Sequence, residues 1–402
     1  MIFRRSGLLV LQAALLWSAC RNTEERPAPA SWNDSPAGPE SRLPSLFSDP
    51  SDGLWLSWME EQDTVAAFRF STLTDSGWSA PRTIAESSQW FLNWADYPML
   101  ASDGHGHLAA HVLERNGDGK FAYSIRVFLS SDSGKTWPVR MLLNTDTVEG
   151  EHGFVSMQPT DVPGEWFMTW LDGRNTGGGD GHGHHGSMSL RAARIGSDGS
   201  RLDEWELDNR TCDCCQTSAL WTSAGPVVAY RDRSDEEIRD ISVRWFSSDA
   251  WSHPVHPASD NWKIEGCPVN GPRLAGRGQE TGLIWFTGAG DSSQVKFARS
   301  RDGGRSFGSW TLLNGAHTAG RVDLVALPDR TYAASWLEDK DIRLRIIRPD
   351  GSIGPIRTVA TTTAGRSSGF PQLEAFRDRM VLAWTDTEER KVKIRILDEG
   401  TR

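Results

Sequence analysis

One plan recurs seven times along this chain of 402 residues: a short apolar strand, a polar turn rich in Gly, Asp or Pro, and an alternating strand that usually ends in Trp with an acidic residue close behind. Equivalent positions lie near Pro44, Pro98, Gln158, Ser218, Pro272, Val322 and Pro371. A spacing of roughly 50 to 60 residues matches one four-stranded blade of a β-propeller. No segment after the first 20 residues has strong helical periodicity, so we predict an all-β fold in which the recurring Trp packs between blades.

A second signature marks the hairpin that follows each pair of strands. The segments SSDSGKTW (130–137) and SRDGGRSF (300–307) share the pattern S-x-D-x-G-x-x-[WF], in which Asp132 and Asp302 occupy the third position. In such a turn the carboxylate accepts bonds from backbone N–H groups, and Gly supplies a positive φ. We therefore predict a structural role for both aspartates.

These hairpins resemble the Asp-boxes, or BNR repeats, of the sialidase superfamily, and the resemblance covers most of the mature chain. It implies a sialidase-like propeller, but it specifies the fold more than the function, because the turn also occurs in propellers that are not sialidases. Sialidase propellers have six blades, whereas this chain has six complete units and a seventh, from Pro371 onward, with room for only three strands. We predict seven blades, closed by a strand from residues 31–41, with a six-bladed ring as the alternative.

The first 20 residues have the features of an export signal. Arg4 and Arg5 precede an apolar run from Gly7 to Ala19, and small residues come directly before Cys20. This run is too short for a permanent transmembrane helix, and no later run approaches about 18 uninterrupted apolar residues. The segment resembles a bacterial lipoprotein signal in which Cys20 is the lipidated residue. An ordinary cleaved signal peptide and twin-arginine export remain alternatives.

The predicted signal divides the chain into three parts. Residues 1–20 form the signal, residues 21–41 form a tether rich in Pro, Ser and charge, and residues 42–402 form the propeller. We expect a lipid-anchored monomer outside the cytoplasm, in the periplasm or on the cell surface. Its formal net charge of −10 argues against a nucleic acid as partner, because phosphate binding requires a basic surface.

The cysteines of the mature chain map to one face of the predicted ring. In a four-stranded meander A-B-C-D, successive turns alternate between the two ends of the sheet, so the D–A and B–C connections share one face, which we name the top face. The segment RTCDCCQT (210–217) carries Cys212, Cys214 and Cys215 in the connection into blade four, and Cys267 lies in the connection into blade five. All four cysteines are therefore expected on the top face.

Histidines map to the same face on blade three. His184 and His185 belong to a Gly/His tract in the B–C connection of that blade, and His152 lies just before its first strand. The C-x-x-C spacing of Cys212 and Cys215, together with nearby imidazoles, suits copper or zinc, and we hypothesise a Cys/His metal site. Two disulfides, or a redox C-x-x-C without metal, remain alternatives, because exported thiols tend to become oxidised.

Three arginines precede the first strands of consecutive blades. Arg42 begins blade one, and Arg321 and Arg366 precede blades six and seven. The segment that starts at Arg42 resembles the R-I-P element of sialidases, and the resemblance implies an arginine triad that holds the carboxylate of a sugar acid. Asp96 is then a candidate acid beside Arg42. The alternative is that each arginine pairs with an acid at a blade edge, such as Glu338.

The resemblance also implies a tyrosine nucleophile backed by a glutamate. Among the four tyrosines of the chain, we expect only Tyr97 and Tyr230 to approach the top face, and we expect Tyr123 to begin a C strand. The leading hypothesis is a sialidase-like propeller that binds or processes a small extracellular molecule or glycan through a Cys/His site. The alternatives are an exo-glycosidase that acts on an acidic sugar and a non-catalytic envelope scaffold.

Overall fold

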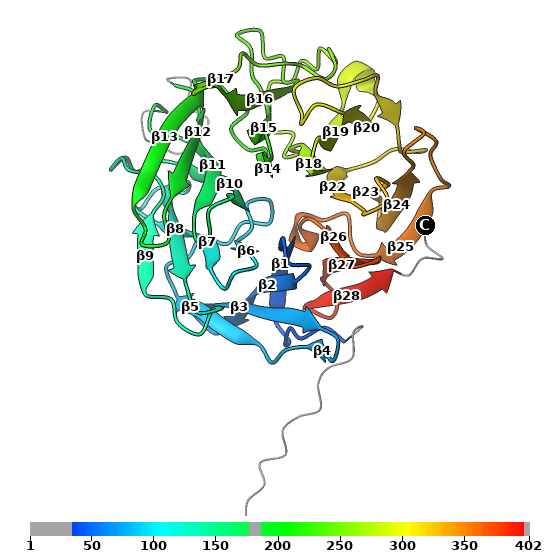
Figure 1. The fold of residues 1–402 in the computed structure, drawn as a ribbon. Coiled ribbons are helices and arrows are strands. Elements are labelled where there is room, and N and C mark those ends of the chain that lie inside the picture. The colour runs from blue at the N-terminus through cyan, green and yellow to red at the C-terminus, as the bar shows by residue number, and fades with distance from the viewer. Residues whose placement is uncertain (1–33, 177–185, 398–402) are drawn as a thin grey trace, which may run out of the picture.

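The structure, a computed structural model, describes residues 34–176 and 186–397. Its strands form seven antiparallel sheets arranged as the blades of a ring, with the first strand of each sheet nearest the centre (Figure 1). The prediction of an all-β propeller with seven blades is confirmed. Within the described ranges the helices are two short 3-10 turns, η1 (Ala289–Asp291) and η2 (Arg366–Ser368), and no helix there has the length and apolar character needed to cross a membrane.

The first three blades follow one another around the ring. Blade one contains β1 (Ser41–Ser48), β2 (Leu54–Gln62), β3 (Val65–Thr74), β4 (Gly77–Trp78) and β5 (Arg82–Ser87), and both β4 and β5 pair with β3. Blade two contains β6 (Met99–Ser102), β7 (Leu108–Arg115), β8 (Tyr123–Ser130) and β9 (Val139–Leu142). Blade three contains β10 (His152–Pro159), β11 (Trp166–Asp172), β12 (Ser189–Ile195) and β13 (Arg201–Asp208).

The remaining four blades complete the circle. Blade four contains β14 (Ser218–Thr222), β15 (Gly225–Arg231), β16 (Ile241–Ser247) and β17 (Ala250–Trp251). Blade five contains β18 (Arg273–Arg277), β19 (Glu280–Thr287), β20 (Gln294–Ser300) and β21 (Thr311–Leu312). Blade six contains β22 (Gly320–Ala326), β23 (Tyr332–Glu338), β24 (Asp341–Ile347) and β25 (Arg357–Thr361), and blade seven contains β26 (Gln372–Phe376), β27 (Arg379–Asp386) and β28 (Lys391–Leu397).

The ring closes where the N-terminal segment meets blade seven. That blade has three strands, as its length predicted, and Pro39 forms an antiparallel bridge with Lys391 at the start of β28. The Ser41 hydroxyl accepts a hydrogen bond of 2.9 Å from the Val392 amide. Proline has no backbone N–H to donate, so Pro39 forms an isolated bridge with Lys391 and not part of a longer ladder. The segment then continues directly into β1 of blade one.

In blades three and six the tryptophan that ends the alternating strand is a core residue with a fixed polar partner. The indole Nε1 of Trp170 donates to Asp172 at 2.8 Å, and that of Trp336 donates to Glu338 at 3.0 Å. Residues i and i+2 point to the same face of a strand, so the W-x-[DE] spacing places indole and carboxylate side by side. Both tryptophans are at most 1% exposed, as predicted for packing between blades.

Two hairpin turns share one pattern of hydrogen bonds around an aspartate. Asp132 accepts bonds from the Ser130 hydroxyl (2.8 Å), the Thr136 amide (2.9 Å) and the Thr136 hydroxyl (2.7 Å) in the turn between β8 and β9. Asp302 makes the equivalent three bonds in the turn between β20 and β21. Each carboxylate thus holds the shape of a C–D hairpin.

Polar side chains on the innermost strands connect each blade to the next. An innermost strand is the edge of its sheet, so its unpaired N–H groups need acceptors from elsewhere. Examples of bonds from a backbone N–H to a side-chain oxygen of the preceding blade run from Ala219 to Ser156 (2.9 Å), from Leu274 to Ser218 (2.9 Å) and from Leu373 to Asp323 (2.7 Å). These inter-blade bonds set how neighbouring blades lie against each other around the axis.

Replacement of Ser218 tests the inter-blade bonds. Ser218→Ala leaves the buried Leu274 N–H without its acceptor, and we expect the free energy of unfolding to fall by about 1–3 kcal/mol. Urea unfolding followed by tryptophan fluorescence measures the change. Ser88→Ala, at an exposed position, is the control and should differ from the unsubstituted protein by less than about 0.5 kcal/mol. Coincident curves for the two variants would contradict the assigned role.

Candidate functional site

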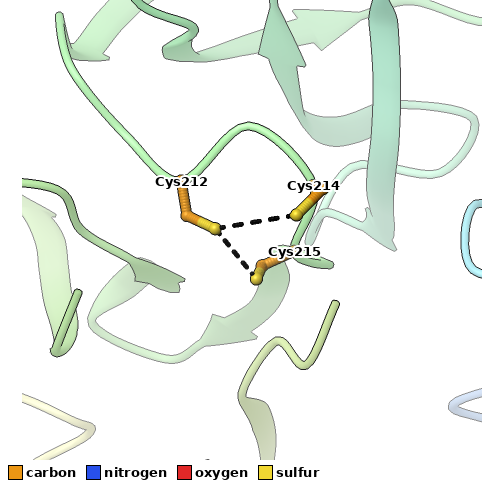
Figure 2. A group of neighbouring side chains, drawn as sticks. All are labelled: Cys212, Cys214 and Cys215. Atoms are coloured by element: carbon orange, nitrogen blue, oxygen red, sulfur yellow. Dashed lines mark hydrogen bonds between the residues drawn. The ribbon is translucent and has the colours of Figure 1, made fainter. Parts of the chain in front are cut away.

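Three thiols meet in the connection between β13 and β14 (Figure 2). The Sγ atom of Cys212 lies 3.0 Å from that of Cys215 and 4.0 Å from that of Cys214, and all three side chains are buried. Cys267 lies in the connection between β17 and β18, is exposed, and is close enough to interact with the Cys214 thiol. All four are free cysteines, so no disulfide joins any pair of them in the described residues.

Hydrogen bonds on both sides of the thiols fix their loop to neighbouring strands and connections. The Cys212 amide donates to the carbonyl of Arg231 at the end of β15, at 3.0 Å. Just after the thiols, the Gln216 side chain donates to the Ala95 carbonyl (2.6 Å) and accepts from the Gly271 amide (3.0 Å). These partners precede the first strands of blades two and five, so the loop is fixed across three blades.

The three thiols have different tendencies to ionise. Burial opposes ionisation of Cys212, but hydrogen bonds from Cys214 and Cys215 and the charge of Arg239, whose Nη1 lies 3.5 Å from the Cys212 sulfur, together hold its pKa well below the usual range. Burial and the neighbouring thiols raise the pKa of Cys214 and of Cys215. The group therefore favours one thiolate, at Cys212, which the two other thiols stabilise.

A charged loop between β15 and β16 positions the guanidinium beside the thiols. Arg239 donates to Glu237 at 2.8 Å, and Arg233 donates to Glu237 at 2.7 Å and to Asp213 at 3.0 Å. Burial raises the pKa of Asp213 despite the nearby Arg233. Sequence reasoning did not identify Arg239, because it lies in a different connection from the cysteines and no motif joins the two.

A buried phenol and two carboxyls form a second titratable group beside the thiols. The Tyr123 hydroxyl donates to Glu151 at 2.6 Å, and the electrostatic influence of Cys214 reaches Tyr123. Burial raises the pKa of Glu151 to about 7. Burial also raises the pKa of Asp96 well above its usual range, against a hydrogen bond from the Phe154 amide. Asp96 therefore lies with Glu151, and within the described residues no hydrogen bond or ion pair joins it to Arg42, whose partner is Glu61.

The expectation that only Tyr97 and Tyr230 approach this face was wrong for Tyr123. Tyr123 does begin a C strand, β8, but a C strand begins at the B–C connection and hence at the top face. The hydroxyls of the other two are engaged elsewhere, Tyr97 with Arg273 and Tyr230 with Asp208.

Two of the three arginines predicted to form a triad have partners of their own. Arg42 pairs with Glu61 at 2.6 Å. This is the type of pairing that the alternative proposed, between an arginine and an acid at a blade edge, although with a different acid. Arg321 is 6% exposed and donates to the Ser368 hydroxyl and to the carbonyls of residues 364, 365 and 369. Arg366 lies exposed in η2. A bulge in β22 gives Arg321 a φ of 51°, and its guanidinium lies against η2.

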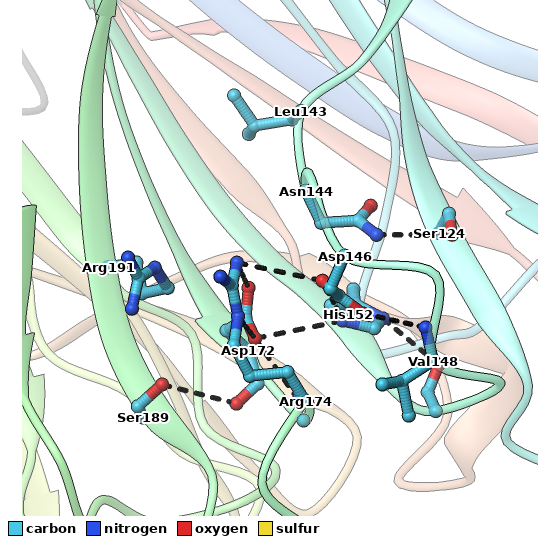
Figure 3. Close-up of polar contacts among 12 residues, drawn as sticks. Ser124, Leu143, Asn144, Asp146, Val148, His152, Asp172, Arg174, Ser189 and Arg191 are labelled. Carbon is cyan, nitrogen blue, oxygen red and sulfur yellow. Dashed lines mark hydrogen bonds and ion pairs between the residues drawn. The ribbon is translucent and has the colours of Figure 1, made fainter. Parts of the chain in front are cut away.

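His152 belongs to a group separate from the thiols, which corrects the single predicted Cys/His site. Its Nε2 lies 3.1 Å from a carboxylate oxygen of Asp146 and 3.7 Å from one of Asp172 (Figure 3). The candidate metal ligands thus form one thiol group and one His/carboxylate group. His184, His185 and Cys20 lie outside the described residues.

No protein-family model matches this chain, and a search of curated proteins finds no match. Solved structures that are similar to it include the α-L-arabinofuranosidase Arb93A from Fusarium graminearum (TM-score 0.50, 12% identity, 92% of this chain and 96% of that one). A puromycin-hydrolysing peptidase from Mycobacterium tuberculosis (0.51, 11%, 91% and 56%) and the Hadza microbial sialidase Hz136 (0.45, 12%, 90% and 66%) also match. The structural neighbours are thus sialidases and other propeller hydrolases, and at these identities the likeness shows the fold alone.

The raised pKa of Glu151 has a consequence for stability. Between its ordinary pKa of 4.5 and its folded pKa of about 7, the folded protein binds more protons at this carboxyl than the unfolded chain does, so its contribution to stability falls as pH rises. Glu151→Gln has no proton to lose. We expect the stability of this variant, relative to the unsubstituted protein, to increase from pH 5 to pH 8 in urea unfolding. A difference independent of pH would contradict the burial of an ionisable Glu151.

Proposed function

We propose that this propeller binds a thiophilic metal ion, copper(I) or zinc, at Cys212, Cys214 and Cys215. The observation that carries the proposal is the approach of three buried Sγ atoms to within 4.8 Å of one another. Thiolates are preferred ligands of both ions. Bonds of about 2.3 Å in tetrahedral geometry place two sulfurs about 3.8 Å apart. The Cys212–Cys214 separation of 4.0 Å already fits, and Cys215, at 3.0 Å from Cys212, needs a shift of less than about 1 Å.

Two positively charged side chains near the thiols can stabilise a metal–thiolate centre of high negative charge. Three thiolates around copper(I) carry a net charge of −2, and a buried charge of that size requires nearby cations. Arg239 approaches Cys212 to 3.5 Å, and the charge of the buried Arg231 reaches Cys215. Both guanidiniums are fixed by other contacts, Arg231 by the carbonyls of Asn270 and Phe286 and Arg239 by Glu237, so they are in place before a metal binds.

Cys267 distinguishes the two candidate ions. Four thiolates are a typical set for structural zinc, whereas three thiolates suffice for a soft monovalent ion such as copper(I). Cys267 is exposed and faces Cys214, so its recruitment would complete a four-thiolate set. A role of Cys267 as ligand therefore favours zinc, and its dispensability favours copper(I).

Elemental analysis tests the thiol site. Protein purified without a His-tag under reducing conditions is expected to hold about one equivalent of copper or zinc, because structural thiolate sites bind tightly. The variant with Cys212→Ser and Cys215→Ser should lose this metal, while Cys267→Ser should retain copper and lose zinc. Absence of stoichiometric copper or zinc in this protein, with its four thiols reduced, would exclude the proposal.

We also infer that the protein acts outside the cytoplasm as a lipoprotein anchored through Cys20. The supporting observations are the basic start, the apolar run and the small residues before Cys20. Cys20→Ser removes the acyl attachment and is expected to move the protein from the membrane fraction to the soluble periplasmic fraction, because the acyl chains hold it at the membrane. Immunoblots of fractionated cells measure this, and unchanged membrane retention would exclude lipidation at this residue.

The exo-glycosidase alternative has less support from the geometry. It needs guanidinium groups that are available to a sugar carboxylate, whereas Arg42 pairs with Glu61 and Arg321 is bound by carbonyl groups. The Tyr123–Glu151 pair has the residue types of a sialidase nucleophile, but Tyr123 is 0% exposed. Turnover of a fluorogenic sialoside that is lost in Arg42→Ala would restore this alternative. A scaffold is favoured if neither metal nor turnover is found.

A further inference from the structure

The His/carboxylate group of blade three is a second, independent cluster of possible metal ligands. His152 begins β10 and Asp172 ends β11, and the two are paired across these strands, so their side chains emerge together at the end of the blade. Asp146 lies in the connection between β9 and β10. Figure 3 shows the three side chains converging, with Nε2 of His152 at 3.1 Å from Oδ2 of Asp146 and 3.7 Å from Oδ1 of Asp172.

The imidazole of His152 is held in one orientation. Its Nδ1 lies 3.1 Å from the carbonyl oxygens of both Tyr123 and Gly150. Carbonyl oxygens only accept hydrogen bonds, so Nδ1 carries a proton and donates, and Nε2 faces the two carboxylates. Metal-bound histidines are oriented by the same kind of contact from the far nitrogen to a carbonyl.

The space between these three side chains requires a positive charge. A lone pair that faces two carboxylate oxygens is repelled by them unless a proton or a metal ion lies between. His152 is 0% exposed, and neither its Nε2 nor Oδ2 of Asp146 has a hydrogen-bond partner within residues 34–176 and 186–397. Nε2 of His152 and Oδ2 of Asp146 are therefore close, but they are not aligned as an N–H···O hydrogen bond would be. A proton on Nε2 would favour that alignment.

The distances match those between ligands of one metal ion. Bonds of about 2.0–2.2 Å from a metal to nitrogen and oxygen place neighbouring ligand atoms about 3.0–3.5 Å apart. The separation of 3.1 Å between Nε2 and Asp146 lies in this range, that of 3.7 Å to Asp172 is about 0.2 Å longer, and all three ligand atoms lie within 4.8 Å of one another. We propose that Asp146, His152 and Asp172 bind a divalent cation that prefers oxygen and nitrogen ligands, separately from the thiol site.

Arg174 acts as an outer partner of this site. Its Nε and Nη2 donate to the two carboxylate oxygens of Asp172 at 2.7 and 2.8 Å, and its Nη2 lies 3.6 Å from Asp146. Ligating carboxylates are commonly oriented by such hydrogen bonds. The two carboxylates supply a charge of −2 to the cation, and the charge of Arg174 opposes the cation and keeps its affinity moderate. Asp146, with a side chain 11% exposed, is the ligand nearest to solvent.

A titration with Mn²⁺ tests the proposal. Mn²⁺ prefers oxygen and nitrogen to thiolate ligands, so the thiols do not compete for it. Chelator-treated full-length protein is titrated, and free Mn²⁺ is followed by its EPR signal. We expect one saturable site. Asp146→Asn keeps the shape of the side chain without its charge and should weaken binding by at least about tenfold. Cys215→Ser should bind Mn²⁺ as the unsubstituted protein does.

The control variants separate this site from all others. Asp146→Asn leaves the sequence of the Gly/His tract and of the thiol loop unchanged. Any Mn²⁺ bound at those places is therefore the same in the variant and in the unsubstituted protein, and the difference between them reports on the Asp146 site. Equal Mn²⁺ affinity in Asp146→Asn and the unsubstituted protein would overturn the proposal. The absence of saturable binding in folded protein would also overturn it, and ¹⁵N NMR would then show a proton on Nε2 of His152 in an imidazolium–carboxylate ion pair. Unchanged Mn²⁺ binding by Cys215→Ser would show that the measured site does not depend on the thiols.

Discussion

The innermost strand of each blade has an unpaired edge, and the bonds that satisfy this edge organise the whole molecule. Side-chain oxygens of Ser156, Ser218 and Asp323 accept N–H groups of the next blade. The same role extends into the connections that precede these strands, where Gln216 and Asn270 accept amide bonds from neighbouring blades at 3.0 and 2.7 Å. The loops that carry Gln216 and Asn270 are thereby fixed by hydrogen bonds to neighbouring blades.

The thiol loop is one of these connections. Gln216, which joins blades two, four and five, directly follows Cys215, so the cysteines take their positions from a contact needed to assemble the ring. Burial of the thiols disfavours their ionised form because it removes them from water. Nearby guanidinium groups, which are held by carbonyls or acids, offset this cost. Arg231 and Arg239 serve the thiols in this way. On blade three the corresponding balance involves Arg174.

The two candidate sites differ in chemistry because they lie at different places in the blade. A loop between blades has irregular backbone, so the side chains of Cys212 and Cys215 are able to turn toward each other across a C-x-x-C segment. The ends of paired strands instead place residues at fixed register, and His152 and Asp172 are opposite each other for that reason. One geometry collects soft sulfur ligands from a short stretch of chain, and the other collects nitrogen and oxygen ligands from two strands and a connection.

The repeat of the sequence by itself determined the propeller, the burial of most of the recurring tryptophans and the connections in which the cysteines lie, and it favoured seven blades over six, because periodicity and strand alternation follow directly from residue order. Only the tertiary structure decided which side chains of the top face meet. A bulge with φ of 51° at Arg321 sends its guanidinium into a carbonyl-lined contact, and His152 joins Asp146 in place of the thiols. Arg239 reaches Cys212 from another connection. Sequence spacing assigns a residue to a strand or a loop, but the direction of its side chain depends on bulges, loop conformation and the partners that neighbouring blades supply.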